Sequence, residues 1–326
     1  MQNRSALLSL ISATLLGFAL LAAAGCRGGG GAVPESLPAT LPESALPPLP
    51  PLELEERLAS LLRPPADPLS LRWSAQPGDS WQEQISLQQT VQHSGPDLPQ
   101  SSTEVEQSFT VSHRVTGQND GAFSVAAELS SPEVRFAPAM AGMESRLIEK
   151  LDGLGYSYEV EPDGSKRGAP VSGDAVEAAG GLARALLANL EMNSLALPGE
   201  PVTVGDRWQR TREVALPAGA GAEVPATIDS EYVLAGVLLL DERRLAAIRV
   251  ETITTMRGPL ATAHLKGEVV GRSRGHGLVL FDLTLGRPWY SEHFAATHQQ
   301  VLVSDAGERR LLIQDHTLRL SSEETQ

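Results

Sequence analysis

The chain has 326 residues, with 26 Lys and Arg against 40 Asp and Glu, and its formal net charge is −14. This acidic balance argues against nucleic-acid binding, which relies on clustered Lys and Arg. The hydrophobic content of 41% argues against a wholly disordered chain, and the length allows one large or two moderate domains. A single Cys excludes an intramolecular disulfide framework and a Cys-rich zinc site.

Residues 1–25 have the three parts of a secretory signal peptide. Arg4 and the α-amino group form a short positive start, residues 6–24 are uncharged and rich in Leu and Ala, and small residues precede Cys26. Later in the sequence there is no uncharged apolar stretch of about 18 residues, so we expect no other membrane-spanning helix.

The only Cys stands where a bacterial lipobox requires it, at the end of Leu21-Ala22-Ala23-Ala24-Gly25-Cys26. We expect cleavage between Gly25 and Cys26, a diacylglyceryl group on the thiol, a further acyl chain such as palmitate on the new amine, and membrane attachment through Cys26. An ordinary signal peptide or an uncleaved anchor helix is the alternative. Arg27 stands where an Asp favours inner-membrane retention, so the sequence favours the outer membrane.

Residues 26–51 have the composition of a tether. Four consecutive Gly residues at 28–31 are followed by seven Pro residues between 32 and 51, which predicts a disordered spacer that holds the body away from the lipid. Residues 52–68 follow as a short helix and linker, because four Leu residues recur at helical spacing before Pro64-Pro65.

From about Leu69 the hydrophobic pattern has a period of two. Over Trp81–Gln92, Trp81, Ile85, Leu87 and Val91 occupy odd positions, whereas the even positions carry only Gln, Ser or Thr. This alternation predicts an antiparallel strand with one buried face. Further strands are expected at Phe109–Val115, Phe123–Leu129, Gly155–Glu161, Trp208–Leu216, Ala226–Leu240, Arg243–Thr255, Ala261–Ser273, His276–Leu285, Trp289–Val303 and Arg309–Ser321.

Two amphipathic helices are predicted within this β-rich body. The first spans about Ala139–Leu151 and the second about Asp174–Asn193. The apolar stripe of the second includes Leu186, Leu187 and Leu190, which are candidates for a lid over a ligand. The predicted fold is therefore mainly β with two or three helices, built as a sandwich or as an open sheet resembling half a barrel.

A short motif occurs twice, which predicts an internal duplication. Gly78-Asp79-Ser80-Trp81 recurs as Gly205-Asp206-Arg207-Trp208, and each copy opens a strand. We interpret the motif as structural, because Gly and Asp make turns and Trp begins the inward face. The expected divisions are a first β repeat at 69–170, a connecting amphipathic helix at 171–200 and a second β repeat at 201–326.

The segment around the second copy resembles a family of uncharacterised bacterial envelope lipoproteins. Members carry a lipobox at the start and a mid-chain Pro-Val-x-Val-Gly-Asp-x-Trp segment, which matches Pro201-Val202-Thr203-Val204-Gly205-Asp206-Arg207-Trp208. The resemblance covers about Leu69–Leu320. It implies a location and a fold but no activity.

Residues with catalytic potential are present without the context that catalysis needs. Gly271-Arg272-Ser273-Arg274-Gly275 matches the Gly-x-Ser-x-Gly pattern of serine hydrolases, with Asp282 and His293 in the hydrolase order. That pattern requires a helix after the Ser, whereas a strand is expected here, so we interpret the segment as a hairpin turn. The seven His residues show no metal-binding spacing. We expect no enzyme activity, no metal and no cofactor.

The sequence therefore predicts a membrane-anchored envelope lipoprotein that binds a partner or serves a structural role without catalysis. The alternative is a carrier of lipid or another hydrophobic ligand, because a curved sheet covered by a helix makes an apolar groove, as in lipoprotein-localisation factors. A serine hydrolase is the remote alternative. The sequence identifies neither the envelope partner nor the ligand.

Overall fold

A computed structural model describes residues 33–96, 98–136, 144–171, 195–219, 222–240, 242–261, 266–305 and 308–325. These residues form an 11-stranded sheet in the order β5-β4-β3-β2-β1-β11-β10-β9-β8-β7-β6, with every pairing antiparallel. The strands are β1 (Ser80–Gly95), β2 (Leu98–Asn119), β3 (Ala122–Phe136), β4 (Gly155–Val160), β5 (Lys166–Val171), β6 (Arg207–Gly219), β7 (Ala222–Leu240), β8 (Arg243–Ala261), β9 (Lys266–Asp282), β10 (Arg287–Asp305) and β11 (Glu308–Thr325). The expectation of a mainly β body with an open sheet is confirmed.

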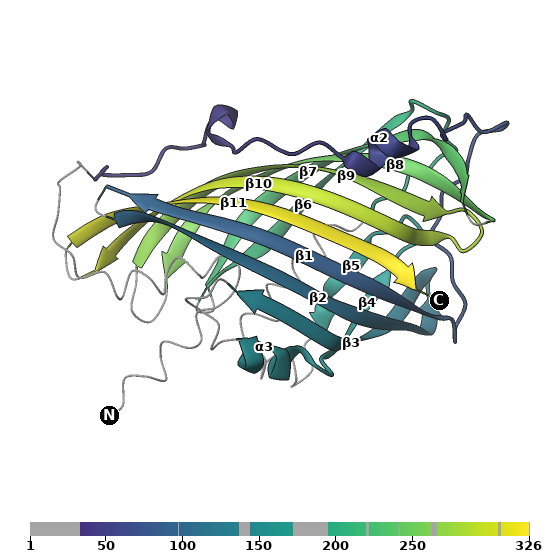
Figure 1. Ribbon diagram of the computed structural model, residues 1–326, viewed down its shortest axis with the longest axis horizontal. Helices are drawn as coiled ribbons and strands as arrows, with labels where there is room; N and C mark the ends of the chain where they lie inside the picture. The colour runs from purple at the N-terminus through teal and green to yellow at the C-terminus, as the bar shows by residue number, and fades with distance from the viewer. Residues whose placement is uncertain are drawn as a thin grey trace.

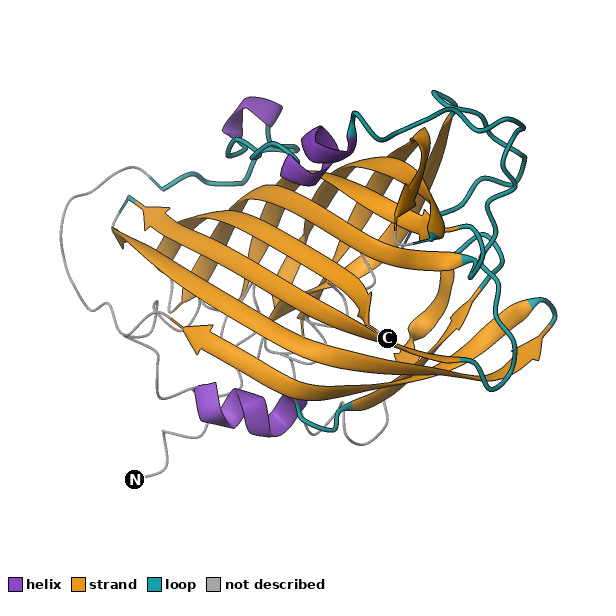
Figure 2. Ribbon diagram, turned by 45° about the vertical axis from the view of Figure 1, so that its right-hand side comes forward, coloured by secondary structure: helices purple, strands orange, loops and turns teal. Residues whose placement is uncertain are grey.

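The pairing of β1 with β11 joins the two halves of the chain into one sheet. It runs without a register shift from Gln82 opposite Thr325 to Ser94 opposite Ile313. Each half is a meander that ends at an edge, at β5 in the first half and at β6 in the second. Long antiparallel strands twist, and this sheet curls into a trough (Figures 1 and 2).

One hydrophobic cluster defines the inner face of the trough. It joins Trp81, Phe109 and Val125 from the first half to Leu234 and Ile248 from the second half. Val125 on β3 and Leu234 on β7 come from strands near opposite edges, so the cluster shows that both sides of the sheet face the same interior. Along β1 the residues at 81, 85, 87 and 91 are buried and the even-numbered ones are mostly exposed, which confirms the alternation expected there.

The outer face is covered in part by residues 33–62, which we call the strap. The strap contains the 3-10 helix η1 (Glu43–Ala45) and helix α2 (Glu53–Leu58). Leu37 and Leu41 pack against β9 and β10, and Leu52 and Leu58 pack in a cluster with side chains of β7, β8 and β9.

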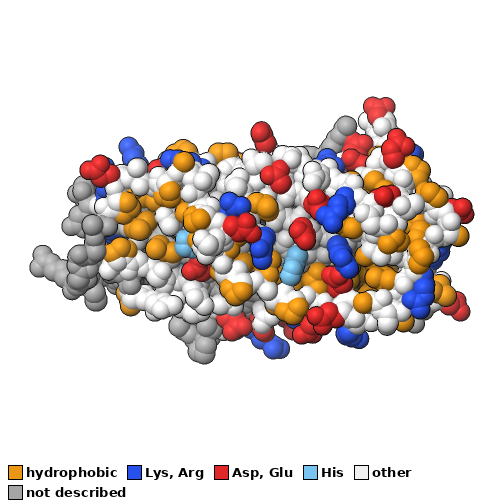
Figure 3. Space-filling view, turned by 90° about the horizontal axis from the view of Figure 1, so that it is seen from above, with side chains coloured by type: hydrophobic (Ala, Val, Ile, Leu, Met, Phe, Trp, Pro, Cys, Tyr) orange, Lys and Arg blue, Asp and Glu red, His pale blue; other side chains and the backbone are white. Residues whose placement is uncertain are grey.

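Basic side chains of the sheet also bind the strap. Nη1 of Arg274 lies 3.0 Å from Oε1 of Glu43, and Nη1 of Arg309 donates to the carbonyl of Glu35 at 3.0 Å. Seen from the side of the strap, acidic and basic side chains are interspersed rather than gathered by sign (Figure 3). Residues 33–51 therefore differ from the free spacer expected from their Pro content, because Leu37 and Leu41 are buried on the sheet. Residues 26–32 lie outside the described residues.

The two copies of the Gly-Asp-x-Trp motif make the same turn. Gly78 and Gly205 have φ of 98° and 90°, a left-handed conformation that favours glycine. An Oδ2 atom of Asp79 and of Asp206 accepts a backbone N–H from three residues earlier, at 2.7 Å in both turns. Each glycine N–H donates to a carbonyl of the second strand of its own half, at 2.9 Å in both.

The Trp residues of the two motifs also have matching environments. Trp81 stacks on His113 with an interplanar angle of 13°, and Trp208 stacks on Tyr232 with an angle of 12°. In both cases the partner is the residue directly opposite on the next strand. The motif therefore sets the register at the start of β1 and of β6.

Strand β9 differs from the expectation. The segment Gly271–Gly275 was expected to form a hairpin turn between two strands, but it lies within one strand, Lys266–Asp282. Its glycines leave room for side chains of the neighbouring strands: a Cβ on Gly277 would contact the ring of His293, and one on Gly271 would contact Met256. A run of glycine can thus mark close packing within a strand.

The described part of the first predicted helix is α3 (Glu144–Leu151), which packs beside β3. Leu151 is buried in the inner cluster, and Oε1 of Glu144 accepts the backbone N–H of Phe136 at 2.9 Å. The second predicted helix, at about 174–193, lies outside the described residues. Within the part of the chain that the structure describes, every helix is too short or too polar to span a bilayer.

We predict that Asp79→Ala and Asp206→Ala each lower the free energy of unfolding by about 1 kcal/mol, because each removes an equivalent hydrogen bond at the start of a strand. Urea unfolding measures both losses. Asp67→Ala, at an exposed position outside the sheet, is the control. A loss no larger than that of the control would contradict the shared role of the two turns.

Candidate functional site

One end of the trough is closed by two segments that lie outside the sheet. Leu69 forms an isolated bridge with Val202, and the backbone N–H of Trp73 donates to the carbonyl of Pro162 at 2.8 Å. The backbone N–H of Leu197 donates to the carbonyl of Asp163 at 2.6 Å. These contacts place Trp73 and Leu197 across the end of the inner face.

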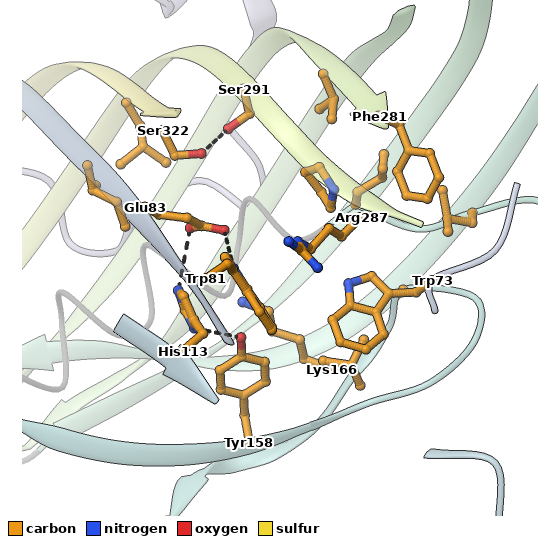
Figure 4. A pocket seen from close by; sticks show the side chains of 18 of the residues that line it. Trp73, Trp81, Glu83, His113, Tyr158, Lys166, Phe281, Arg287, Ser291 and Ser322 are labelled. Carbon is orange, nitrogen blue, oxygen red and sulfur yellow. Dashed lines mark hydrogen bonds and ion pairs between the residues drawn. The ribbon is translucent and has the colours of Figure 1, made fainter. Parts of the chain in front are cut away.

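A pocket of about 110 Å³, which we call the end pocket, lies beneath these segments (Figure 4). Its wall is mostly aromatic and aliphatic, with a smaller set of polar and charged side chains. The aromatic residues are Trp73, Trp81, Tyr156, Tyr158 and Phe281; the aliphatic ones include Ile85, Val160, Leu195, Leu197, Val279 and Leu320; the polar ones are Glu83, His113, Lys166, Arg287, Ser291 and Ser322.

Trp81 is the centre of the aromatic wall. Its ring stacks on His113 at 4.9 Å between centroids, and Cζ of Arg287 lies 4.8 Å from its centroid. Trp73 meets it edge-on at 6.0 Å and lies 5.0 Å from Phe123. The rings are buried, so the wall is rigid and largely apolar.

A chain of polar contacts runs along the wall from Tyr158 to Glu83. Nδ1 of His113 lies 3.1 Å from the hydroxyl of Tyr158, and Nε2 lies 3.7 Å from Oε2 of Glu83. Nε1 of Trp81 donates to Oε1 of Glu83 at 3.3 Å. These contacts fix the orientation of both rings.

The surroundings of Glu83 and Tyr158 shift the pKa values of both groups. Burial is the largest effect on Glu83 and raises the pKa of its carboxyl. The nearby His113, the cation of Lys166 and the hydrogen bond from Trp81 act in the opposite direction, and together they leave this pKa below its usual 4.5. Burial raises the pKa of Tyr158 well above 10, with Tyr156 and Glu83 adding to the shift. At neutral pH Glu83 is therefore ionised and Tyr158 is a neutral phenol.

Two cations flank the pocket. Arg287 binds Glu324 through two hydrogen bonds of 2.9 Å, and both side chains are nearly buried, at 10% and 8% exposed. Nζ of Lys166 lies 4.6 Å from the ring centroid of Tyr158. The guanidinium of Arg287 therefore lies against the ring of Trp81 and is held in place by Glu324. It forms one side of the pocket.

The arrangement suits an apolar group. An apolar cavity of about 150 Å³ accommodates a benzene molecule, whereas sites for whole drug-sized ligands measure about 300–1,000 Å³. At about 110 Å³ the end pocket is large enough for the end of an alkyl chain but smaller than the cavity that holds benzene. Arg287 is paired with Glu324, and Glu83 is held by Trp81 and lies beside His113.

The structure does not bring together the residues of the hydrolase pattern. Ser273 lies within β9, where its hydroxyl donates to the carbonyl of Ala296 at 3.2 Å. Asp282 is nine residues further along the same strand, about 30 Å away, and is bound to Arg243. His293 lies opposite Gly277, not Ser273.

The other expected site residues are distributed as follows. Trp81 lines the end pocket, whereas Nε1 of Trp208 donates to the carbonyl of Ala196 at 2.8 Å. Gly78, Asp79, Gly205 and Asp206 form the paired turns. Gly25, Cys26 and the lid candidates Leu186, Leu187 and Leu190 lie outside the described residues. Among the residues that are described, no group of three or more His, Cys, Asp or Glu side chains is arranged to hold a metal ion.

Glu83 and Arg287 were not singled out from the sequence. A signal for Glu83 existed, because it occupies an odd position on β1 and so shares the buried face with Trp81 and Ile85. A carboxylate on a buried face needs a partner, and such a residue marks a position of interest. Arg287 lies far from β1 in sequence, so its place over Trp81 follows only from the pairing of β1 with β11 and of β11 with β10.

Comparison with known proteins leaves the family of this chain open. No protein-family model matches it, and no curated protein matches it. Among solved structures, it is similar to a LolA superfamily protein from Nitrosomonas europaea, with 8% identity over 74% of this chain and 85% of that one, at a TM-score of 0.14. A similarity of this extent carries no weight for fold or function.

We predict that Glu83→Gln reduces the loss of stability in acid. The pKa of Glu83 is lower in the folded than in the unfolded chain, so its ionised form stabilises the fold above about pH 4.5, and this stabilisation is lost as the pH falls through the lowered pKa. Urea unfolding at several pH values measures the slope. The control is Glu128→Gln, at an exposed position of β3, and equal slopes in the two variants would contradict the assignment.

Proposed function

We propose that this protein is a non-catalytic binding protein of the bacterial cell envelope that carries a hydrophobic or amphiphilic ligand on the inner face of its sheet. The observation that carries the proposal is the end pocket, where aromatic rings and aliphatic side chains line a space at the closed end of the trough. The apolar end of the ligand occupies this pocket, and its remaining length lies along the inner face.

The composition of the inner face supports this proposal. The inner cluster continues from the end pocket along both halves of the sheet, from Ile85 and Leu87 to Leu234 and Ile248. Contact with these side chains would remove the apolar area of a ligand chain from water, and burial of apolar area contributes roughly 25 cal/mol per Å². The sites that bind such ligands are concave and mostly apolar, with a few fixed polar groups, which matches the wall around Trp81.

The chemistry of the pocket supports a role without catalysis. Covalent catalysis needs a nucleophile activated by a base within hydrogen-bond reach. In the end pocket, the hydroxyl beside His113 is that of Tyr158, whose pKa burial raises, so its reactive anion is disfavoured. Ser273 donates to a carbonyl within a strand and has no His beside it.

The proposed location rests on the sequence. A secretory signal that ends in a lipobox directs lipidation of Cys26, and the envelope lipoproteins that share the Pro-Val-x-Val-Gly-Asp-x-Trp segment carry the same two features. Arg27 in place of an acidic residue favours the outer membrane. A ligand carrier anchored there meets lipids directly, which is consistent with the apolar inner face.

We predict that Ser322→Phe weakens ligand binding at least tenfold, because Ser322 lines the end pocket and a Phe side chain would fill it. Binding of a fluorescent fatty acid to purified protein measures the effect. The matched control is Ser321→Phe, whose side chain points to the other face of β11. Equal binding by the two variants, or none by the unmodified protein, would contradict the proposal.

We predict that Cys26→Ser releases the protein from membranes, because the thiol is the only site for the diacylglyceryl group. Fractionation of cells that produce each form measures the distribution between membrane and soluble fractions. Release of the protein by Cys26→Ser is the expected result, and continued retention in the membrane fraction would count against lipidation.

A further inference from the structure

A group of buried polar side chains crosses the inner face beyond the end pocket, and we call it the polar band. It comprises Gln89 and His93 of β1, Gln299 of β10, and Gln314 and His316 of β11. Their exposed fractions range from 0% for Gln314 to 7% for Gln89 and His316. Aliphatic side chains such as Val91, Val301 and Leu312 are buried beside them on the same face, so five long polar side chains in one place require an explanation.

The register of the sheet brings these residues together. His93 lies opposite Gln314, and Gln314 lies opposite Gln299 on the next strand. His316 is two residues further along β11 on the same face. Leu320, which lines the end pocket, is four residues beyond His316, so the band begins about 13 Å from the pocket along the same face.

The polar band leaves specific atoms without partners. Nε2 of Gln314 lies 3.3 Å from Nδ1 of His93, and Nε2 of Gln89 lies 3.5 Å from Nδ1 of His316. An amide nitrogen donates, so each imidazole accepts at Nδ1 and carries its proton on Nε2. Both Nε2 atoms and Oε1 of Gln314 are buried without a hydrogen-bond partner.

These groups are uncharged. Burial lowers the pKa of His93, and burial together with His93 lowers the pKa of His316 to about 4. The band itself contains no Lys, Arg, Asp or Glu. It therefore presents two neutral N–H donors and one carbonyl acceptor to the interior of the trough.

His298, on the outer face of β10, is a histidine that does have a carboxylate partner. Nδ1 of His298 lies 2.6 Å from Oδ1 of Asp315 on the neighbouring strand. Among the described residues, no ion pair with a carboxylate is found for His93 or His316, and a Leu or Val at either position would fill the interior without an unpaired donor. Keeping buried donors unpaired costs stability unless a ligand uses them.

We propose that the polar band binds an uncharged hydrogen-bond acceptor in the ligand, such as the ester carbonyl of an acyl ester, through Nε2 of His93 and Nε2 of His316. This assignment rests on the proposed function and names the ligand class: an acyl ester whose chain end lies in the end pocket. An ester oxygen accepts the two N–H groups without adding charge to a buried site. An ionised carboxylate has no cation within the band to offset its desolvation.

The test compares two probes that differ in one group, a pyrene-labelled acyl ester and a pyrene-labelled alkane of equal length. The unmodified protein is expected to bind the ester about tenfold more tightly, as a pair of hydrogen bonds to otherwise unpaired donors provides. The double variant His93→Leu, His316→Leu is expected to lose this preference while keeping its affinity for the alkane. His298→Leu, on the outer face, is the matched control and should keep the preference.

Each outcome separates this inference from the proposed function. If the unmodified protein binds both probes equally, or if the double variant keeps the preference, the inference is overturned and the carrier function stands. If neither probe binds, the carrier function itself fails. A pyrene-labelled fatty acid that binds as tightly as the ester overturns the assignment to an uncharged acceptor.

A second measurement uses the unmodified protein and does not depend on how the variants fold. In ¹⁵N-labelled protein, the imidazole Nε2 resonances of His93 and His316 should shift when the acyl ester is added, while those of His298 stay in place. Unchanged resonances of His93 and His316 in an ester-saturated sample would overturn the inference.

Discussion

The pairing of β1 with β11 is the interaction on which the rest of the structure depends. It joins the first strand of the chain to the last one, over the length of β1 from Gln82 to Ser94. Without it, the two meanders would be separate sheets, each with an exposed apolar face. With it, the apolar faces of both halves form one interior, and the two edges at β5 and β6 are left apart.

The end pocket and the polar band both follow from this joint. Trp81 and Glu83 come from β1, whereas Arg287 and Leu320 come from β10 and β11, and only the joined sheet places them around one space. The polar band spans the same joint, since His93 lies on one side of it and Gln314 on the other. The side chains that we propose to bind the ligand therefore lie where the two halves meet.

The hydrophobic pattern of the sequence predicted where the strands lie better than it predicted which segments pack against them. The alternation around Trp81 and Ile85 identified β1, because a half-buried strand has a period of two. Gly271–Gly275 was assigned to a turn, because glycine in a strand also reflects contacts with side chains far away in sequence. The packing of Leu37 on the outer face was not predicted either. A Pro-rich composition predicts an extended segment, but it does not show whether that segment is free or bound to the sheet.

The candidate site was predictable only in part. Trp81 stood out from the repeat, and Glu83 and His93 share its face of β1, but their partners depend on strand pairings that no local spacing specifies. The repeated motif makes the same turn in both halves, yet the ring that stacks on its Trp is His113 in the first half and Tyr232 in the second, and of these two His113 lines the end pocket. The two halves thus share a turn but contribute different side chains to the proposed site.

The most direct test of the account is quenching of tryptophan fluorescence by a brominated acyl ester. Trp81 lines the end pocket, whereas Trp289 packs on the outer face beside the strap. In variants that keep only one of these residues as the single Trp, with the others changed to Phe, the account predicts strong quenching of Trp81 and little quenching of Trp289. Equal quenching of the two, or none of Trp81, would contradict binding on the inner face.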